Sequence, residues 1–332
     1  MKIAVLAGGL SPERTVSLSS GTLACNTFVQ AGHQAILLDL FFGMPELPGS
    51  VEELYTRAHV LPAPTIGEKE QDMQADPGEL TECGGMELEI CREADIVYMA
   101  LHGADGENGS IQAVFDKEGI RYTGSGPEGC RLAMEKNLSK ALFDEASVLS
   151  PGWKLLEDLP LPAVAKPNSG GSSIGISIAH TRQELQQAID LAFAQEDCIL
   201  IEEYIQGREL SCGVLDGKAL PVIEIIPKEG FYDYKNKYQP GATTEITPAP
   251  ISPRDTLAVQ QAAEKVFRLL KLQVYGRIDF LLTEDGRPYC LEANTLPGMT
   301  PTSLLPQEAA AAGMDYLTLC EKVISLSLEK YQ

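Results

Sequence analysis

The chain has 332 residues, 44% of them hydrophobic, and a formal net charge of −21. This length is enough for two or three domains with cores of their own. The negative charge argues against nucleic acid as a main partner and against an anionic membrane surface. The eight cysteines include no CxxC pair, and no apolar run is long enough for a signal peptide or a membrane span. We therefore expect a soluble, cytoplasmic protein without a disulfide framework.

The first part of the chain alternates short apolar runs with helical patterns. Helices are expected at Val16–Ala31 and Ile111–Lys117, and strands at Ile3–Ala7, Ala35–Leu40 and Asp95–Leu101. Strands that alternate with helices are typical of a parallel sheet. Residues 42–85 are rich in Pro, Gly and acidic side chains, apart from one short helix at Val51–Ala58. We interpret them as an elaborated connection within the first domain.

The rest of the chain has strands and helices that no longer alternate regularly. Helices are expected at Cys130–Glu145, Arg182–Ala194, Asp255–Leu270 and Met314–Leu328. Short strands are expected at Ala163–Lys166, Gly175–Ile178, Cys198–Glu203, Glu209–Leu215 and Leu220–Ile226. We therefore predict an α/β chain whose C-terminal part is α+β.

One hairpin near the C-terminus concentrates polar side chains. An Asp-Gly pair at 285–286 is a strong signal for a two-residue turn. Pairing the strands outward from it places Asp279 opposite Glu292 and places Arg277 opposite Asn294, with all four side chains on one face. Like charges opposite each other destabilise a sheet, so we expect a cation between the carboxylates. Oxygen ligands of this kind suit Mg²⁺, and the alternative is a solvated hairpin with chance acidic residues.

A loop rich in glycine and serine follows the strand that ends at Lys166. Its sequence is Lys166-Pro167-Asn168-Ser169-Gly170-Gly171-Ser172-Ser173. Backbone amides in such a loop can approach phosphates closely. It is not a Walker A loop, because the lysine precedes the glycines, and an ordinary hairpin loop is the alternative.

Two further segments suggest nucleotide binding to different degrees. The stretch 199–205 is apolar, then doubly acidic at Glu202 and Glu203, then apolar, so it either reads a nucleotide base or ends in solvated acids. The stretch 124–129 is a literal G-x-G-x-x-G, but it follows the third strand, and Pro127 suits a helix start. We interpret this second stretch as a turn and a helix start rather than a dinucleotide site.

Polar residues also follow strands of the first domain. His102 ends the third strand, where ligand clefts form in α/β sheets, and Glu13 lies in the loop after the first strand. A carboxylate at Glu13 suits an ammonium group, and the alternative is a surface salt bridge. For His102 the alternative is a structural histidine.

Two later segments also suggest ligand contacts. The aromatic and cationic stretch 231–238 is typical of a lid over a charged ligand. Loop amides and Ser303 near a helix start can hold a carboxylate.

Several motifs occur together in an order that is specific as a set. They are the segments 11–17, 101–103, 122–126, 166–173, 231–238, 276–279 and 291–300. With them the chain closely resembles the D-alanine–D-alanine ligases of the ATP-grasp superfamily, from Lys2 to about Leu328 except in residues 42–85. The resemblance implies a Rossmann-like, parallel-sheet substrate domain at 1–124. A two-part ATP-grasp fold then follows at 125–202 and 203–332, and its second part carries the metal site and the lid.

The resemblance also implies a reaction. The carboxylate of a first D-alanine attacks the γ-phosphate of ATP and forms an acylphosphate. The amine of a second D-alanine then displaces phosphate through a tetrahedral intermediate. The product, D-alanyl-D-alanine, serves peptidoglycan precursor synthesis, and thereby cell-wall biogenesis and cell shape. The implied partners are ATP, D-alanine and two Mg²⁺ ions, which Mn²⁺ can replace, in a homodimer.

By the same matching, individual residues receive roles. ATP binding is assigned to Lys136, Lys166, Glu202, Glu203, Ile205 and Glu209. Metal binding is assigned to Asp279, Glu292 and Asn294, and substrate binding to Glu13, His102, Lys237, Ser303 and Leu304. Arg277 and the Gly298 amide are assigned to the developing oxyanion. Tyr238 and Ser172 are assigned to a hydrogen-bonded closed state that keeps water from the acylphosphate.

Two alternatives stay open beside this prediction. One is a ligase that adds D-serine, D-lactate or another acceptor, and the other is a catalytically inactive ATP-grasp binding protein. Tyr238 favours D-alanine as the acceptor, since relatives that add D-lactate tend to carry histidine in the lid. Arg277 argues against inactivity, because a binding module has no need of it. The chain departs from the family pattern at 168–171, at 301–302 and at Glu135.

Overall fold

The computed structural model describes residues 1–40, 49–61, 86–153, 159–228, 230–232, 236–237, 239 and 241–332. They form two compact units. The first unit joins Met1–Pro127 to the C-terminal segment Leu296–Gln332, and the second comprises Glu128–Thr295. The sequence analysis assigned the C-terminal segment to the third domain, whereas the structure groups it with the first. The predicted division at residue 202 stays a prediction.

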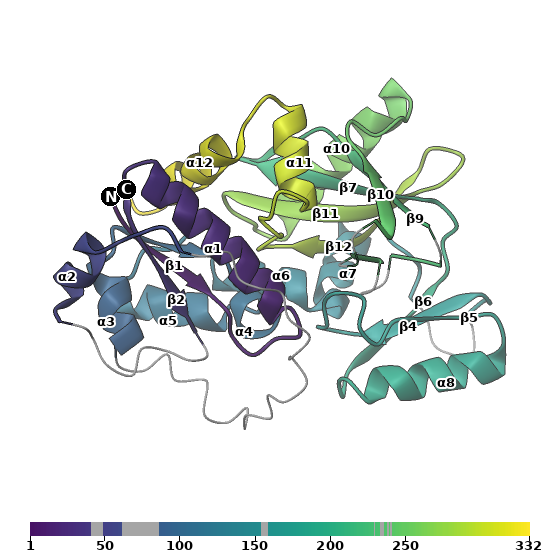
Figure 1. Ribbon diagram of the computed structural model, residues 1–332. Helices are drawn as coiled ribbons and strands as arrows, with labels where there is room; N and C mark the ends of the chain where they lie inside the picture. Colours follow the sequence, from purple (N-terminus) through teal and green to yellow (C-terminus); the bar gives the residue numbers. More distant parts are fainter. Residues whose placement is uncertain are drawn as a thin grey trace. The chain divides into compact units, whose positions relative to one another are not determined.

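A parallel sheet of three strands forms the centre of the first unit, in the order β2-β1-β3. Its strands β1 and β2 are labelled in Figure 1. The strands are β1 (Lys2–Ala7), β2 (Gln34–Asp39) and β3 (Ile96–Met99). The side chains of residues 3–7 are fully buried, as expected for a parallel strand covered on both faces. The parallel sheet predicted from the alternation of strands and helices is therefore confirmed.

The helices of the first unit pack on this sheet or on one another, and the last of them ties the C-terminus to the sheet. They are α1 (Arg14–Gln30), α2 (Val51–Thr56), α3 (Met86–Glu93), α4 (Ala104–Glu107), α5 (Ser110–Glu118), α11 (Leu304–Ala311) and α12 (Tyr316–Glu329). Helix α1 packs on β1 and β2, and α12 packs on β3. The Tyr98 hydroxyl donates to Cys320 Sγ at 3.6 Å, and the Gly124 amide donates to Ser327 Oγ at 3.2 Å. These contacts explain why the last 37 residues, 296–332, belong to the first unit.

The second unit contains two antiparallel sheets. The smaller has the order β5-β4-β6 and contacts α8, and the larger has the order β10-β9-β7-β11-β12, with β8 beside β7, and contacts α10. The strands are β4 (Ala163–Pro167), β5 (Ser177–Ala179), β6 (Ile199–Glu203), β7 (Arg208–Leu215), β8 (Lys218–Ala219), β9 (Ile223–Pro227), β10 (Thr243–Ile246), β11 (Tyr275–Leu282) and β12 (Pro288–Asn294). The helices are α6 (Pro127–Met134), α7 (Lys136–Glu145), α8 (Arg182–Phe193) and α10 (Pro253–Leu269). Within the described ranges, no helix of either unit is long and apolar enough to cross a bilayer.

The helix predicted over Cys130–Glu145 is in fact two helices, α6 and α7, which meet at Glu135. Glu135 has φ −81° and ψ 97°, outside the helical region. The Lys136 amide donates to the Asn168 carbonyl at 3.0 Å. The segment contains neither glycine nor proline, so the sequence carries no local signal for this break. The break fixes the start of α7 against the loop that follows β4.

The hairpin of β11 and β12 has the predicted pairing at its polar end. Arg277 pairs with Asn294, and Asp279 pairs with Glu292. The four side chains named from the sequence are therefore directly opposed across the two strands.

The predicted two-residue turn of this hairpin is wrong. Segment 283–287 closes a three-residue loop instead, and Gly286 takes a left-handed φ of 80° at its end. The strands leave this loop with Phe280 opposite Cys290, one residue out of phase with the polar end. A β-bulge absorbs the extra residue, Leu291, and restores the predicted pairing. Two deviations from the prediction therefore cancel.

Candidate active site

The second unit has a cavity of about 450 Å³ that is lined by residues from both sheets. This volume is typical of a small-molecule site. One part of its wall is apolar and includes Val164, Ile176, Ile178, Ile225, Leu281 and Leu291. Eight of the predicted site residues also line it: Lys166, Glu202, Glu203, Ile205, Glu209, Lys237, Asp279 and Glu292. An apolar slot next to charged groups suits a ligand with a flat ring and an anionic tail.

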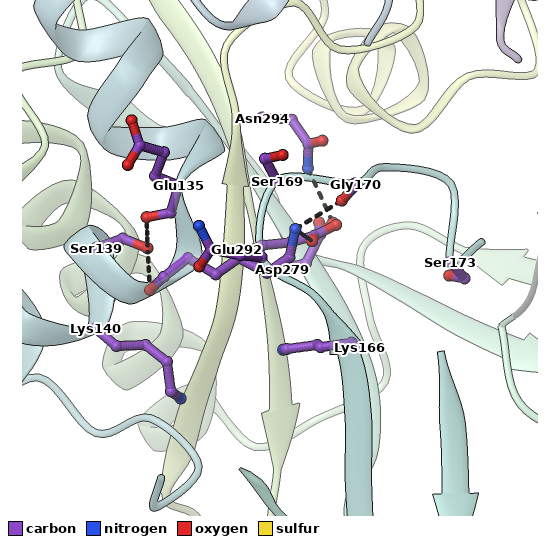
Figure 2. A network of polar contacts seen from close by, with 12 residues as sticks. Glu135, Ser139, Lys140, Lys166, Ser169, Gly170, Ser173, Asp279, Glu292 and Asn294 are labelled. Atoms are coloured by element: carbon purple, nitrogen blue, oxygen red, sulfur yellow. Dashed lines mark hydrogen bonds and ion pairs between the residues drawn. The ribbon is translucent and has the colours of Figure 1, made fainter. Parts of the chain in front are cut away.

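Asp279 lies at the centre of a hydrogen-bond cluster on the hairpin. Arg277 donates from Nε to Oδ1 and from Nη2 to Oδ2, both at 2.9 Å. Asn294 Nδ2 donates to Oδ2 at 3.2 Å, and Asp279 and Asn294 are drawn together in Figure 2. Ser211 of β7 donates to Oδ1 at 2.7 Å. The sequence analysis did not identify Ser211, because β7 and β11 are distant in the sequence and become neighbours only in the folded sheet.

Opposite charges keep this cluster charged although it is buried. Burial acts against the charge of Arg277, yet Asp279 raises the pKa of the guanidinium further above its usual value. Burial likewise works to raise the pKa of Glu292, but Lys136 and Lys237 outweigh it and hold that pKa well below its usual value. Both the arginine and the carboxylate are therefore charged at neutral pH.

Lys136 connects the hairpin to the loop after β4. Its Nζ lies 3.5 Å from Glu292 Oε2 and donates to the Gly170 carbonyl at 2.7 Å (Figure 2). The same loop is anchored at its start, where the Ser169 amide and hydroxyl both donate to the Glu196 carboxylate at 2.8 Å. These contacts fix the loop next to the ammonium group of Lys136.

The donor set on the hairpin fits a magnesium ion. Asp279 and Glu292 supply carboxylate oxygens, and the Asn294 amide supplies an oxygen once it rotates and gives up its hydrogen bond to Asp279. Mg²⁺ prefers such hard oxygen ligands. Across the described residues, no three His, Cys, Asp or Glu side chains cluster as metal ligands. The amide of Asn294 is therefore needed to reach three protein ligands.

The second half of the loop after β4 reaches the predicted lid. Ser172 and Ser173 both take left-handed φ angles, 51° and 59°, which are costly for residues with a side chain. Ser173 Oγ donates to the Tyr232 carbonyl at 2.9 Å. The sequence analysis chose Ser172 as the link, whereas the contact to Tyr232 comes from its neighbour Ser173. Tyr238, its predicted partner, lies outside the described residues.

Glu202 is buried between two lysines. Lys166 Nζ lies 2.9 Å from Oε2, and Lys140 Nζ lies 2.9 Å from Oε1. Burial works to raise the pKa of Glu202, but Lys166 and Lys140 outweigh it and lower that pKa. The sequence analysis missed Lys140. The four-residue spacing between Lys136 and Lys140 could have indicated it, since residues i and i+4 share one face of a helix.

Three other predicted residues lie around the same cavity. Glu203 accepts from the Gly152 amide at 2.8 Å and donates its own amide to the Gly152 carbonyl at 2.8 Å. Burial raises the pKa of Glu209 to about 7. Lys237 Nζ lies 5.1 Å from the centre of the Tyr232 ring, a cation–π distance.

The first unit brings Glu13 and His102 into one neighbourhood. His102 Nδ1 donates to the Leu296 carbonyl at 2.8 Å, so this nitrogen carries the proton. Its Nε2 lies 3.4 Å from Ser20 Oγ. A Cβ at Gly103, whose φ is 65°, would lie only 2.8 Å from Glu13 Oε2. Glycine at this position therefore leaves room for the carboxylate.

The loop before α11 holds the remaining predicted residues. A Cβ at Gly298 would meet Ser303 Oγ at 2.7 Å, so these two residues face each other directly. Ser303 Oγ accepts from the Thr300 amide at 3.0 Å. Leu304 is the first residue of α11, where backbone amides have no intrahelical acceptor. How the residues of the two units act together stays a prediction.

Comparisons with known proteins agree with the resemblance seen in the motifs. Residues 2–125 match the family model "D-ala D-ala ligase N-terminus", and residues 143–325 match "D-ala D-ala ligase C-terminus". The chain is 42% identical to the D-alanine–D-alanine ligase of Pediococcus pentosaceus, across 98% of this chain and 97% of the relative. It is 41% identical to that of Lacticaseibacillus casei, across 100% of this chain and 97% of the relative. The crystal structure of the D-alanine–D-alanine ligase from Bacillus anthracis complexed with ATP is similar with a TM-score of 0.76 and 30% identity, covering 99% of this chain and 97% of that one. The chain therefore belongs to the D-alanine–D-alanine ligase family.

Proposed function

We propose that this protein joins two D-alanine molecules at the expense of ATP, through an acylphosphate, to supply D-alanyl-D-alanine for peptidoglycan precursors. The observation that carries the proposal is the hairpin, where Arg277, Asp279, Glu292 and Asn294 lie together beside the cavity. A chain that only binds nucleotide needs phosphate and base contacts. It does not need a guanidinium fixed within the metal-binding face.

The cavity is assigned to ATP. Its apolar wall takes the adenine ring, and Glu202, charged and buried, accepts a hydrogen bond from the adenine amino group. Glu209 also lines the cavity and is assigned to the ribose hydroxyls. Lys136 and Lys166 neutralise the phosphates, because both ammonium groups are buried and a buried cation strongly favours an anionic partner.

Asp279, Glu292 and Asn294 are assigned to two Mg²⁺ ions. When bound, the ions spread the negative charge of the transferring phosphoryl group. Arg277 keeps Asp279 in one orientation and presents its charge to the oxyanion that develops at the reacting carbonyl. Electrostatic stabilisation of this kind acts most strongly in a buried site, and Arg277 is only 14% exposed.

The first unit is assigned to the amino acid substrate. Glu13 takes the ammonium group of the first D-alanine. His102, held by the Leu296 carbonyl, lies close to it. Ser303 and the Leu304 amide at the start of α11 are assigned to the carboxylate of the second D-alanine, and Lys237, a residue of the second unit, is assigned to the same carboxylate. The Gly298 amide is assigned to the oxyanion.

We also propose a homodimer that acts in the cytoplasm, where its substrate ATP is made. Sedimentation velocity at micromolar concentration measures the assembly directly. A species of twice the 35.9 kDa chain mass supports the dimer, and a monomer contradicts it.

The test of the function is phosphate release with ATP and Mg²⁺, with D-alanine, D-serine, D-lactate or L-alanine offered and the products identified by mass. We expect D-alanyl-D-alanine and no product from L-alanine. Phosphate release with another acceptor, or without a dipeptide, would overturn the substrate assignment.

A pair of variants separates a catalyst from an inactive binding protein. Glu292→Gln should abolish turnover while ATP still binds, because the carboxylate is assigned to the metal rather than to the nucleotide. Glu284→Gln, at an exposed site in the turn of the same hairpin, should behave as wild type. Full activity of Glu292→Gln would contradict the assignment of the metal site.

A further inference from the structure

Glu202 has two counter-charges, and they occupy different surroundings. The side chains of Glu202, Lys140 and Lys166 are 3%, 2% and 7% exposed, so all three are buried. The two lysine side chains point toward one another from α7 and β4 (Figure 2). One buried carboxylate therefore lies between two buried ammonium groups.

Only one of these lysines faces the cavity. Among the described residues, Lys166 and Glu202 line it, whereas Lys140 does not. Lys140 also donates to the Pro151 carbonyl at 2.7 Å and to Ser150 Oγ at 3.4 Å. The ammonium group of Lys140 is thus held by two hydrogen-bond acceptors of the protein and by its ion pair with Glu202.

Nucleotide binding affects the two lysines unequally. The ammonium group of Lys166 faces the cavity, so an entering phosphate competes with Glu202 for its charge. Lys140 has no access to the cavity and keeps its contact with Glu202. A buried carboxylate without a counter-charge is strongly destabilised and takes up a proton instead. Glu202 would then lose the charge with which it accepts a hydrogen bond from adenine.

We propose that Lys140 is a positioning residue for nucleotide recognition: it keeps the Glu202 carboxylate charged and in one orientation while Lys166 serves the phosphates. This inference rests on the proposed role of Glu202 toward the adenine amino group. Lys140 itself touches neither the nucleotide nor the metal ligands. Its effect should therefore appear in base selectivity rather than in the chemical step.

The discriminating measurement compares ATP with inosine triphosphate, which carries an oxygen acceptor in place of the adenine amino group and cannot donate to Glu202 from that position. Dipeptide formation gives kcat/KM for each nucleotide. A hydrogen bond to a charged group corresponds to a preference of about 10-fold or more for ATP in the wild type. In Lys140→Met this preference should fall toward 1 through a higher KM for ATP, with kcat at saturating ATP within about 3-fold of wild type.

A matched control removes a lysine of α10 whose side chain contacts the end of α7. Lys265 Nζ donates to the Ala146 carbonyl, at the end of α7, at 2.6 Å, and it has no contact with Glu202 among its described bonds. Lys265→Met should keep the wild-type preference for ATP. If Lys140→Met does not fold, Lys140→Gln retains most of the length and a donor without the charge, and it should show the same loss of preference.

A double variant provides the second readout. In a Glu202→Gln background the carboxylate is gone, so adding Lys140→Met should change the ATP preference no further. An equal loss of activity with both nucleotides, or an unchanged preference in both Lys140 variants, would overturn the proposal. If the wild type forms the dipeptide equally well with both nucleotides, Glu202 does not recognise the adenine amino group, and the proposal for Lys140 is overturned as well. A wild type that forms no dipeptide would instead refute the proposed function.

Discussion

The guanidinium of Arg277 and the carboxylate of Asp279 form a two-bond pair between residues two positions apart on one strand. Both side chains project from the same face of β11, and their hydrogen bonds are 2.9 Å long. Such parallel bonds require the planar fork of arginine, which lysine cannot reproduce. The pair fixes the direction of the proposed metal ligand before any ligand enters.

Replacing Arg277 should therefore affect catalysis more than nucleotide affinity. We expect Arg277→Ala to lower kcat by a factor of about 10² or more, the usual cost of removing an oxyanion donor. Arg277→Lys should recover only part of this loss, since it restores the charge but not the two-bond geometry. Steady-state kinetics and ATP titration by calorimetry test both statements. A loss of ATP affinity as large as the loss of kcat would refute the role in catalysis.

Glu209 should give the ligand-free protein a pH-dependent stability. Burial raises its pKa from an ordinary 4.5 to about 7, against the opposing charges of Lys237 and Arg277 and with the like charges of Asp279 and Glu292. Between these two pH values the folded state holds a proton that the unfolded state has released, so stability falls as pH rises through this window. Glu209→Gln cannot ionise, and its stability relative to wild type should increase from pH 5 to pH 8. Urea unfolding of both proteins at four pH values measures this difference, and a constant difference would contradict the prediction.

Gly298 should tolerate no side chain while Ser303 is present. A Cβ there would lie 2.7 Å from Ser303 Oγ, so Gly298→Ala forces the loop or the serine to move. We expect a destabilisation of roughly 1–3 kcal/mol, typical of overpacking, and a raised KM for D-alanine. In a Ser303→Ala background the hydroxyl is absent, and the same change should cost clearly less. Denaturant unfolding of the four proteins in this cycle gives the coupling, and strict additivity would show that the two side chains do not collide.

Glu107 should be needed to hold the substrate loops of the first unit. Its carboxylate accepts from the Gly103 amide at 2.7 Å and from the Leu296 amide at 3.1 Å. A glutamine keeps one acceptor oxygen, so Glu107→Gln weakens one of these bonds and should cost about 1–3 kcal/mol. We also expect the KM for D-alanine to rise more than the KM for ATP. Glu118→Gln, which removes the charge of the surface ion pair with Arg92, is the control and should change stability much less than Glu107→Gln.

The sequence predicted the parts of the fold that depend on local pattern. The buried strand at residues 3–7 and the opposition of Asp279 and Glu292 both follow from short-range periodicity and pairing. The pairing of Asp279 with Glu292 was predicted from a wrong turn. The Asp285-Gly286 pair indicates that the chain reverses direction, but it does not decide between a two-residue and a three-residue loop. A count from the turn gave the right partner only because the bulge at Leu291 adds back one residue.

Features that depend on distant contacts were not predictable in the same way. The break between α6 and α7 is stabilised by a hydrogen bond from the Lys136 amide to the Asn168 carbonyl, and these two residues lie 32 positions apart in the sequence. The spacing of Lys140 to Lys136 indicates a shared helix face, but the burial of Lys140 becomes visible only when β6 brings Glu202 beside it. The same reasoning applies to Ser211, whose partner lies 68 positions away.

The bulge at Leu291 has a consequence for how this hairpin can change length. With a three-residue loop and no bulge, Leu291 would stand opposite Asp279, and Glu292 would project from the far face. Loss of Leu291 alone would instead leave an unbroken ladder that still aligns the four polar side chains. A single insertion or deletion in β12 therefore exchanges the two faces of the strand beyond it, unless a bulge is gained or lost at the same time.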